Sequence, residues 1–270
     1  MSLMRSSGAT RLLAVSLSAA LLLGATSATA QASFAPDVSV SLPGVVANDE
    51  DVVVPSGGSF TLAGDLPSLP SNVELSALTR DGTDVLFSLD VTAVVEGVTL
   101  EPRDIARWDG ATLVLEIDGS ADGIPDGVGI DALLLSSGGN PFLSIDTSAK
   151  VGALDIDDED LFRLLPTPFL FFDGSAEGID PGLDLVGASL VTSTSGLLSF
   201  DGSGSVGGID FDDEDMLGWD QITGDFSLVF DGSASDPALV RTGVVALPEP
   251  GFGVAMAAGL ACLALLCRRR

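Results

Sequence analysis

The chain has 270 residues, with 39 acidic side chains against 11 basic ones and a net charge of −28. Nucleic-acid binding depends on Lys and Arg that neutralise phosphates, so this charge excludes a nucleic-acid partner. The sequence has no His and no Tyr, and its two Cys lie near the C-terminus. These absences exclude His-dependent nucleophilic catalysis and zinc sites made of His or Cys. A pair of carboxylates could still hydrolyse a glycoside. With so many acids such a pair carries no information, and no enzyme is predicted.

The first 32 residues have the three parts of a secretory signal peptide. Arg5 and Arg11 form a basic start, residues 12–23 form an apolar run, and small residues follow as far as Ala32. The apolar run is too short to serve comfortably as a membrane anchor. We therefore expect a signal helix over residues 1–32, export through the Sec translocon, and cleavage by signal peptidase after Ala30 or Ala32.

The body of the chain, residues 33–250, holds all 39 acids but only six basic residues, which gives it a net charge of 6 − 39 = −33. Such a charge favours solubility outside the cell and attraction to cations. The body has no Cys. No disulfide can therefore support it, and its core must be stable through packing alone.

Three landmarks recur along the body at a common spacing and define a repeat. The clearest is the phrase Asp-Gly-Ser-Ala, which begins at residues 118, 173 and 231, at spacings of 55 and 58. Two more landmarks lie upstream of it and keep nearly the same spacing: an acidic landmark at residues 103–105, 159–161 and 214–216, and a Ser-x-Asp landmark at residues 88–90, 144–146 and 199–201. A fainter copy precedes these three copies. We therefore predict one acidic domain over residues 33–247 with four repeats. These are residues 34–77, 78–134, 135–190 and 191–247, and the aspartate of the acidic landmark is Asp51, Asp104, Asp160 or Asp215.

Within each repeat the apolar residues alternate with polar ones, which is the period of a half-buried β-strand. Residues 113–118 and 226–231 show this alternation, and Asp-Gly, Gly-Gly and Pro bound such runs as tight turns do. About four strands fit into each repeat, which is typical of a propeller blade. The predicted fold is therefore all-β, with a small four-bladed β-propeller favoured over a β-sandwich or a solenoid.

Two repeats carry runs of carboxylates at the acidic landmark. Calcium prefers six to eight oxygen ligands, which such side chains supply. The EF-hand pattern fails, because Asp160 stands sixth in its run where Gly is required and no Glu follows at the twelfth position. Two interpretations stay open, a calcium site and acidic turns that are simply hydrated, and the sequence suggests no cofactor other than calcium. The candidate ligands are Asp155, Asp157, Asp158, Asp160, Asp210, Asp212, Asp213 and Asp215.

The aspartate at the fixed place of each repeat has a simpler predicted role, which is to accept backbone N–H groups of its own turn. Trp108 and Trp219 also share one repeat position, four residues after Asp104 and Asp215. They could stack on a sugar, but residues that are equivalent by repeat more often pack in the core. We expect them to be core residues.

The end of the chain, residues 248–270, has three distinct parts. A Pro-Glu-Pro motif comes first, an uncharged apolar run follows, and the chain ends in three arginines. The run is at the lower length limit of a transmembrane helix, and the arginines would keep its end in the cytoplasm. Prolines keep the motif extended, as a protease cleft requires. The parts are Pro248, Glu249 and Pro250, the predicted transmembrane helix at 251–267, and Arg268, Arg269 and Arg270.

This tail resembles the PEP-CTERM sorting signal of Gram-negative bacteria. The resemblance implies that the chain is anchored transiently in the inner membrane and that exosortase, a membrane-embedded cysteine protease, cleaves near the Pro-Glu-Pro motif. It also implies a destination at the cell surface, often where exopolysaccharide is made. We expect an exported, non-enzymatic cell-surface or exopolysaccharide-matrix protein. The alternative is a calcium-dependent carbohydrate-binding or adhesin module.

Overall fold

The structure is a computed structural model of the chain, and it describes residues 40–42, 44–47, 53–56, 59–62, 66–136 and 138–235. These residues form antiparallel β-sheets with three short helices, which confirms the predicted all-β class. The expected signal peptide at 1–32, the sorting tail at 248–270 and Asp51 lie outside the described residues.

Three sheets of four antiparallel strands follow one another along the chain with the same strand order. In each sheet the first strand pairs with the second, the second with the third, and the third with the fourth. The four strands predicted for each repeat are found as this four-stranded sheet in three repeats, and each repeat also contains the two strands of a separate hairpin. The first sheet contains β5 (Leu75–Asp81), β6 (Asp84–Leu89), β9 (Ile105–Trp108) and β10 (Leu113–Ile117); the second β11 (Ile130–Leu135), β12 (Pro141–Ile145), β15 (Leu161–Arg163) and β16 (Phe169–Phe172); the third β17 (Leu185–Thr192), β18 (Ser195–Phe200), β21 (Met216–Asp220) and β22 (Asp225–Phe230).

Each sheet also has a small hairpin between its second and third strands and a short helix after its fourth, neither of which was predicted. Strands of three residues are too short to show a periodic pattern. The hairpins pair β7 (Ala93–Val95) with β8 (Val98–Leu100), β13 (Ala149–Val151) with β14 (Leu154–Ile156), and β19 (Gly204–Val206) with β20 (Ile209–Phe211); the helices are α1 (Gly119–Asp122), α2 (Gly174–Glu177) and α3 (Gly232–Ser235).

The N-terminal strands reproduce only the second part of this plan. β1 (Val40–Leu42) and β2 (Val45–Ala47) pair as the small hairpin does, and β3 (Val53–Ser56) pairs with β4 (Ser59–Leu62) as a third strand does with a fourth. No first or second strand of this sheet occurs in the described part of the chain.

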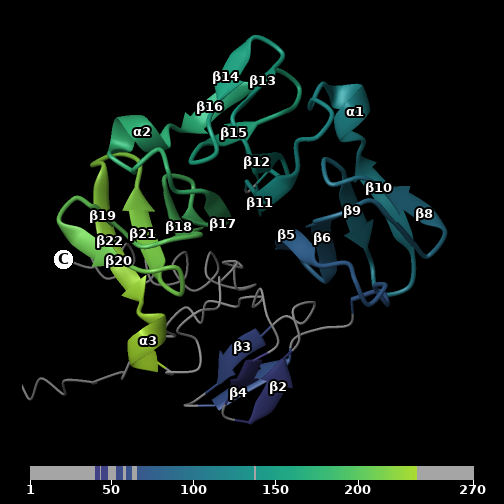
Figure 1. Ribbon diagram of the computed structural model, residues 1–270, viewed down its shortest axis with the longest axis horizontal. Helices are drawn as coiled ribbons and strands as arrows, with labels where there is room; N and C mark the ends of the chain where they lie inside the picture. The colour runs from purple at the N-terminus through teal and green to yellow at the C-terminus, as the bar shows by residue number, and fades with distance from the viewer. Residues whose placement is uncertain are drawn as a thin grey trace, which may run out of the picture.

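Figure 1 shows the three sheets and the N-terminal strands set around a common centre, with β5, β11 and β17 innermost. In agreement, β11 contacts both β5 and β17. Apolar cores fill the spaces between successive sheets: Phe162 lies in the core shared by the first and second sheets, and Trp219 in that shared by the second and third. A further core brings Leu42 of the N-terminal strands against Leu197 of the third sheet. The first and last parts of the repeated body are therefore in contact.

The second strand of each sheet is buried on both faces because it lies between two cores. In β6, Leu86 faces the core shared with the second sheet and Phe87 faces the opposite core, and both are at most 1% exposed. The outer strands are less regular than the predicted alternation. Leu115 is 40% exposed, and a bulge shifts the register of β10 between Leu115 and Ile117. Such a bulge moves the side chains that follow it to the opposite face of the sheet.

The structural unit is displaced from the predicted repeat. Each sheet begins with the strand that the sequence placed at the end of the preceding repeat, so the units begin at Leu75, Ile130 and Leu185. The predicted boundaries at 77/78, 134/135 and 190/191 fall inside β5, β11 and β17. A repeating sequence fixes the period but leaves open where one unit starts.

Candidate functional site

The aspartate of the acidic landmark connects two parts of its own sheet. In each complete sheet one of its carboxylate oxygens accepts the backbone N–H three residues earlier, and the other accepts the N–H of the glycine that begins the helix. For Asp160 both bonds are 3.0 Å, from Asp157 N and from Gly174 N. The predicted structural role of Asp104, Asp160 and Asp215 is confirmed. We call this arrangement the Asp–Gly joint. Its acceptor is Asp104, Asp160 or Asp215, and its donor is Gly119, Gly174 or Gly232, respectively.

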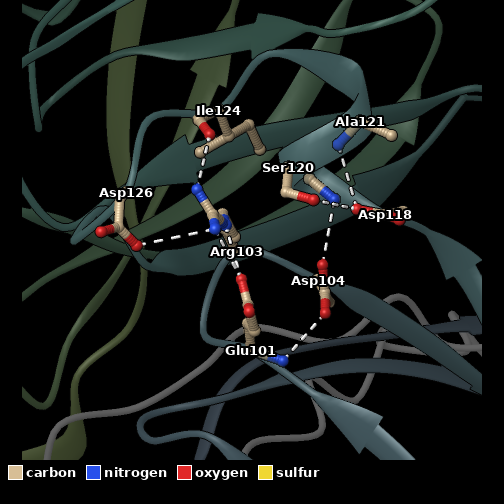
Figure 2. A network of polar contacts seen from close by, with 9 residues as sticks. Glu101, Arg103, Asp104, Asp118, Ser120, Ala121, Ile124 and Asp126 are labelled. Atoms are coloured by element: carbon tan, nitrogen blue, oxygen red, sulfur yellow. Dashed lines mark hydrogen bonds and ion pairs between the residues drawn. The ribbon is translucent and has the colours of Figure 1, made fainter.

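Figure 2 shows the joint of the first sheet together with Arg103, the residue before Asp104. Arg103 Nε donates to Glu101 Oε2 at 2.8 Å, and its Nη1 donates to the Ile124 carbonyl at 3.2 Å. Its Nη2 also lies 3.6 Å from the fully exposed carboxylate of Asp126. The guanidinium therefore ties the turn before β9 to the segment that follows α1.

The Asp-Gly-Ser-Ala phrase is explained by the helix that it starts. Asp118 is the N-cap of α1, with its Oδ1 accepting from Ser120 Oγ at 2.6 Å and from Ala121 N at 3.0 Å (Figure 2). The glycine is required by close approach. A Cβ on Gly174 would lie 2.6 Å from the carbonyl oxygen of Glu159, a separation that real side chains do not show.

The aspartate of the Ser-x-Asp landmark also serves the backbone. Asp146 Oδ1 accepts Gly129 N at 2.8 Å, and Asp201 Oδ1 accepts Asp184 N at 2.8 Å. In both cases the donor directly precedes the first strand of the same sheet. The landmark therefore fixes where the first strand begins beside the second.

In the first and second sheets, a carbonyl of the acidic turn accepts a hydrogen bond from the next sheet. Pro102 O accepts Ile130 N at 2.9 Å, and Asp158 O accepts Leu185 N at 3.1 Å. Ile130 and Leu185 are the first residues of the next sheet's innermost strand. Each accepting carbonyl stands two residues before the aspartate of the Asp–Gly joint, and we call it the turn carbonyl.

The eight carboxylates predicted as calcium ligands are not brought together. Asp155 lies on β14, the second strand of a small hairpin, where it pairs with Lys150 Nζ at 2.7 Å. Asp157 is exposed and Asp158 half-buried in the turn, while Asp160 is occupied by two amides. Asp210, Asp212, Asp213 and Asp215 repeat this distribution in the third sheet. Among the residues the structure describes, no three acidic side chains are grouped so that they could hold a metal ion.

Two glutamates take the place of Arg103 in the other sheets, and both are buried. Glu159 is 0% exposed and Glu214 is 3% exposed. Burial raises the pKa of each to about 7, with further contributions from neighbouring aspartates. Each of these carboxyl groups therefore binds a proton more tightly than an exposed glutamate does.

A further buried carboxyl group lies where the second and third sheets meet. Asp131, on β11, is 8% exposed and lies against Asp184, which directly precedes β17. Burial, followed by the charge of Asp184, raises the pKa of Asp131 well above its usual range, and burial raises the pKa of Asp184 to about 7. The negative charge of each carboxylate opposes ionisation of the other, and this repulsion adds to the cost of burial.

The third sheet carries an open groove of about 500 Å³. Its lining includes Leu197, Gly218, Trp219 and Val229, from three strands of that sheet. Trp219 is only 3% exposed and packs at 4.9 Å between ring centroids against Phe172, so its predicted place in the core is confirmed. Trp108 is partly buried against the core of the first sheet.

The polar groups of these sites accept backbone N–H groups, and four of the carboxyl groups have pKa values that burial raises. Sequence reasoning missed four of the residues involved: Asp131, Glu159, Asp184 and Glu214. A buried glutamate within an acidic run gives no signal in a single sequence. Asp131 did give one, because it stands between Ile130 and Ala132 in an otherwise apolar strand.

No protein-family description matches the sequence, and no curated protein is similar to it. Among solved structures the chain is similar to the extracellular domain of the putative one-component system BT4673 from B. thetaiotaomicron, at 9% identity, over 72% of this chain and 21% of that one, with a TM-score of 0.33. The chain thus spans about a fifth of that protein's length. Similarity also extends to a protein of unknown function from Bacteroides caccae (10% identity, 74% of this chain and 56% of that one, TM-score 0.28) and to YCF48 bound to D1 peptide (6% identity, 72% and 70%, TM-score 0.30). Within the described ranges, no helix is long and apolar enough to cross a membrane.

Proposed function

We propose that the chain is an exported, non-enzymatic protein of the cell surface or exopolysaccharide matrix, processed at a C-terminal sorting signal. One observation carries this proposal: the order of Pro248-Glu249-Pro250, the apolar run at 251–267 and the terminal arginines. The signal peptide at 1–32 is consistent with it, because the body must cross the inner membrane before an enzyme on the outer face can reach the motif. The Sec translocon, signal peptidase and exosortase are the partners.

The absence of an enzymatic role is supported by how the repeated polar residues are used. The aspartates of the Asp–Gly joints accept backbone amides, and those of the Ser-x-Asp landmark do the same. A repeat whose polar residues support the backbone is suited to a scaffold.

We further propose that the body is a four-bladed propeller in which each sheet is a blade. This is supported by the identical strand order of three sheets, by their innermost strands β5, β11 and β17, and by the core that joins the N-terminal strands to the third sheet. The N-terminal strands would belong to the fourth blade.

The test of the sorting proposal is replacement of Pro248, Glu249 and Pro250 by Ala in the native host. The expected result is an uncut precursor that stays in the membrane fraction, because the protease no longer finds its motif. Asp126→Ala, which changes one fully exposed carboxylate, is the control and should be processed normally. A triple variant of normal size and location would refute the sorting proposal.

A further inference from the structure

The first strand of each complete sheet has one extra residue near its start. The register between the first and second strands shifts there, as it does between Leu75 and Ala77 in the first sheet. The residue inside the shift is the extra residue of a β-bulge, and a bulge redirects its side chain out of the regular ladder. The three residues in this position are Ser76, Asp131 and Val186.

In the first sheet this residue bonds to the next sheet. Ser76 Oγ donates to the carbonyl oxygen of Ile130, the first residue of β11, at 2.7 Å. The turn carbonyl of the same sheet, Pro102 O, accepts the N–H of Ile130 at 2.9 Å. Both backbone groups of Ile130 are therefore bonded to the first sheet, at a junction where β5 and β11 lie side by side near the centre of the molecule (Figure 1).

Asp131 takes the place of Ser76 at the junction of the second and third sheets. Its distance in sequence from Leu185, the first residue of β17, is the same, because 130 − 76 and 185 − 131 are both 54. Both carboxylate oxygens of Asp131 are buried, and neither has a hydrogen-bond partner among the described residues. A hydroxyl has a proton to donate, whereas an ionised carboxylate can only accept. A donor in the first sheet is thus replaced by a group that donates only when it is protonated.

The acidic groups that face Asp131 favour a bound proton. Asp184, which directly precedes β17, lies against it, and Asp184 Oδ1 is another buried oxygen with no partner in the described part of the chain. Asp146, which directly follows β12, adds a further negative charge. Burial, followed by these two charges, raises the pKa of Asp131 well above its usual range.

Among the described residues, the strands packed against β11 bring no basic side chain to this junction. β12 and β17 contain no charged residue, and Arg80 lies at the end of β5 away from Ser76. The acidic turn beside Ile130 carries Arg103, but its guanidinium is bonded to a glutamate and a backbone carbonyl. The other charged residues that directly precede or follow these strands, or lie in the acidic turn beside β17, are all acidic: Glu74, Asp90, Asp146, Asp158, Glu159, Asp184 and Asp201.

We propose that the carboxyl group of Asp131 carries a proton and donates it in a hydrogen bond to the Asp184 carboxylate, so that it joins the second sheet to the third as Ser76 joins the first to the second. Loss of this proton at alkaline pH leaves two facing negative charges, and the start of β17 then loosens from β11. The second junction is therefore sensitive to pH, whereas the first is not. This inference depends neither on the sorting reaction nor on a fourth blade.

The first test compares the urea midpoints of full-chain variants at pH 5 and pH 9. Asp131→Ser supplies the donor of the first sheet and cannot titrate. A group whose pKa is raised by folding stabilises the fold below its ordinary pKa and loses that contribution as the pH rises. The wild type should therefore lose more stability than Asp131→Ser between the two values, so that the variant is more stable at pH 9 and no more stable at pH 5. Asp126→Ser, which removes one fully exposed carboxylate, is the control and should lose as much as the wild type.

The second test detects the proton itself. The infrared spectrum of the wild type in heavy water at pH 6 should contain a carboxylic-acid carbonyl band that Asp131→Asn lacks and Asp126→Asn retains. This band should disappear as the pH is raised to 9. Asp184→Asn removes the facing charge and should move that disappearance to lower pH, which tests the proposal even where a substitution at 131 prevents folding.

A wild type that stays more stable than Asp131→Ser at pH 9, or an acid band that does not change when Asp131 is replaced, would overturn the proposal. A titration that Asp184→Asn leaves unchanged would do the same. Calcium at about 1 mM and pH 9 provides the last comparison, and it should affect the wild type and Asp131→Ser equally. A rise in the urea midpoint of the wild type alone would overturn the proposal in favour of a cation bound between the two carboxylates.

Discussion

Asp104, Asp160 and Asp215 are buried carboxylates without a basic partner in their hydrogen bonds, and each is held by two backbone N–H groups instead. An amide is a weaker partner than a guanidinium, but its position is fixed by the backbone and costs no side-chain entropy. Burial raises the pKa of Asp160 and of Asp215, and the two amide bonds counter that rise.

Replacing Asp160 by Ala should lower the free energy of unfolding by about 2–4 kcal/mol, because two buried N–H groups lose their acceptor. Urea unfolding followed by circular dichroism measures this change. Asp157→Ala, in the same acidic run but exposed, should stay within about 0.5 kcal/mol of the wild type. Similar losses in both variants would show that the joint contributes nothing beyond its charge.

The buried glutamates predict that the protein is more stable in mild acid. Glu159 and Glu214 have pKa values raised to about 7, so the folded state binds protons more tightly than the unfolded one. Their favourable contribution is complete below the ordinary pKa of about 4.5 and is lost as the pH rises through about 7. The urea midpoint should therefore be higher at pH 5 than at pH 8.

The double variant Glu159→Gln with Glu214→Gln should show a smaller difference between pH 5 and pH 8, because neither amide titrates. The measurements belong in 0.5 M sodium chloride, which reduces the general repulsion among exposed carboxylates. Asp184 still titrates near 7 in this variant, so part of the slope should remain. An unchanged slope would assign the pH dependence to other groups.

The repeated elements were predictable to the extent that they have local signals. Four strands per repeat follow from alternation and turn residues, and the helices could have been found from Asp118 as N-cap and Gly123 as C-cap. The Asp–Gly joint could not, because it links Asp104 to Gly119, fifteen residues away, through backbone atoms that carry no sequence information. The bulge after Leu115 could not be predicted from the sequence either, because a register shift depends on how two strands pair.

The helix-starting glycine gives a prediction for the element as a unit. Gly174→Ala should destabilise the protein by about 3 kcal/mol, because its Cβ meets the Glu159 carbonyl at 2.6 Å and α2 must move away from the joint. Gly182→Ala is the matched control: its nearest neighbour, Asp180 Oδ1, would be 3.4 Å away. Thermal unfolding of the two variants should separate them clearly, and equal melting temperatures would contradict the close approach.

At the scale of the whole molecule the dominant feature is the charge of −33 on residues 33–250. Like charges on one compact body repel one another, and salt screens that repulsion over about 10 Å at 0.1 M. Adding sodium chloride should therefore raise the urea midpoint steadily, with no saturation at a low concentration.

Calcium provides the comparison that separates screening from a specific site. At matched ionic strength, calcium chloride and sodium chloride should have similar effects if the acidic turns are only hydrated. A saturating rise in melting temperature at about 1 mM calcium would instead show site binding. Such a result would support a calcium site at the candidate ligands that begin at Asp155 and Asp210, or one outside the described residues.

The Asp–Gly joint of the third sheet has a mechanical consequence. The last described helix, α3, begins at Gly232, and the edge strand β22 ends just before it at Phe230. A force applied to the chain beyond Ser235 would peel β22 from β21 one hydrogen bond at a time, which offers little resistance. Before that unzipping begins, the force must break the buried bond from Gly232 N to Asp215 Oδ1, 3.0 Å long. Asp215 would therefore help the third sheet to resist tension along the C-terminal chain, because its bond lies at the end of the sheet from which that chain leaves.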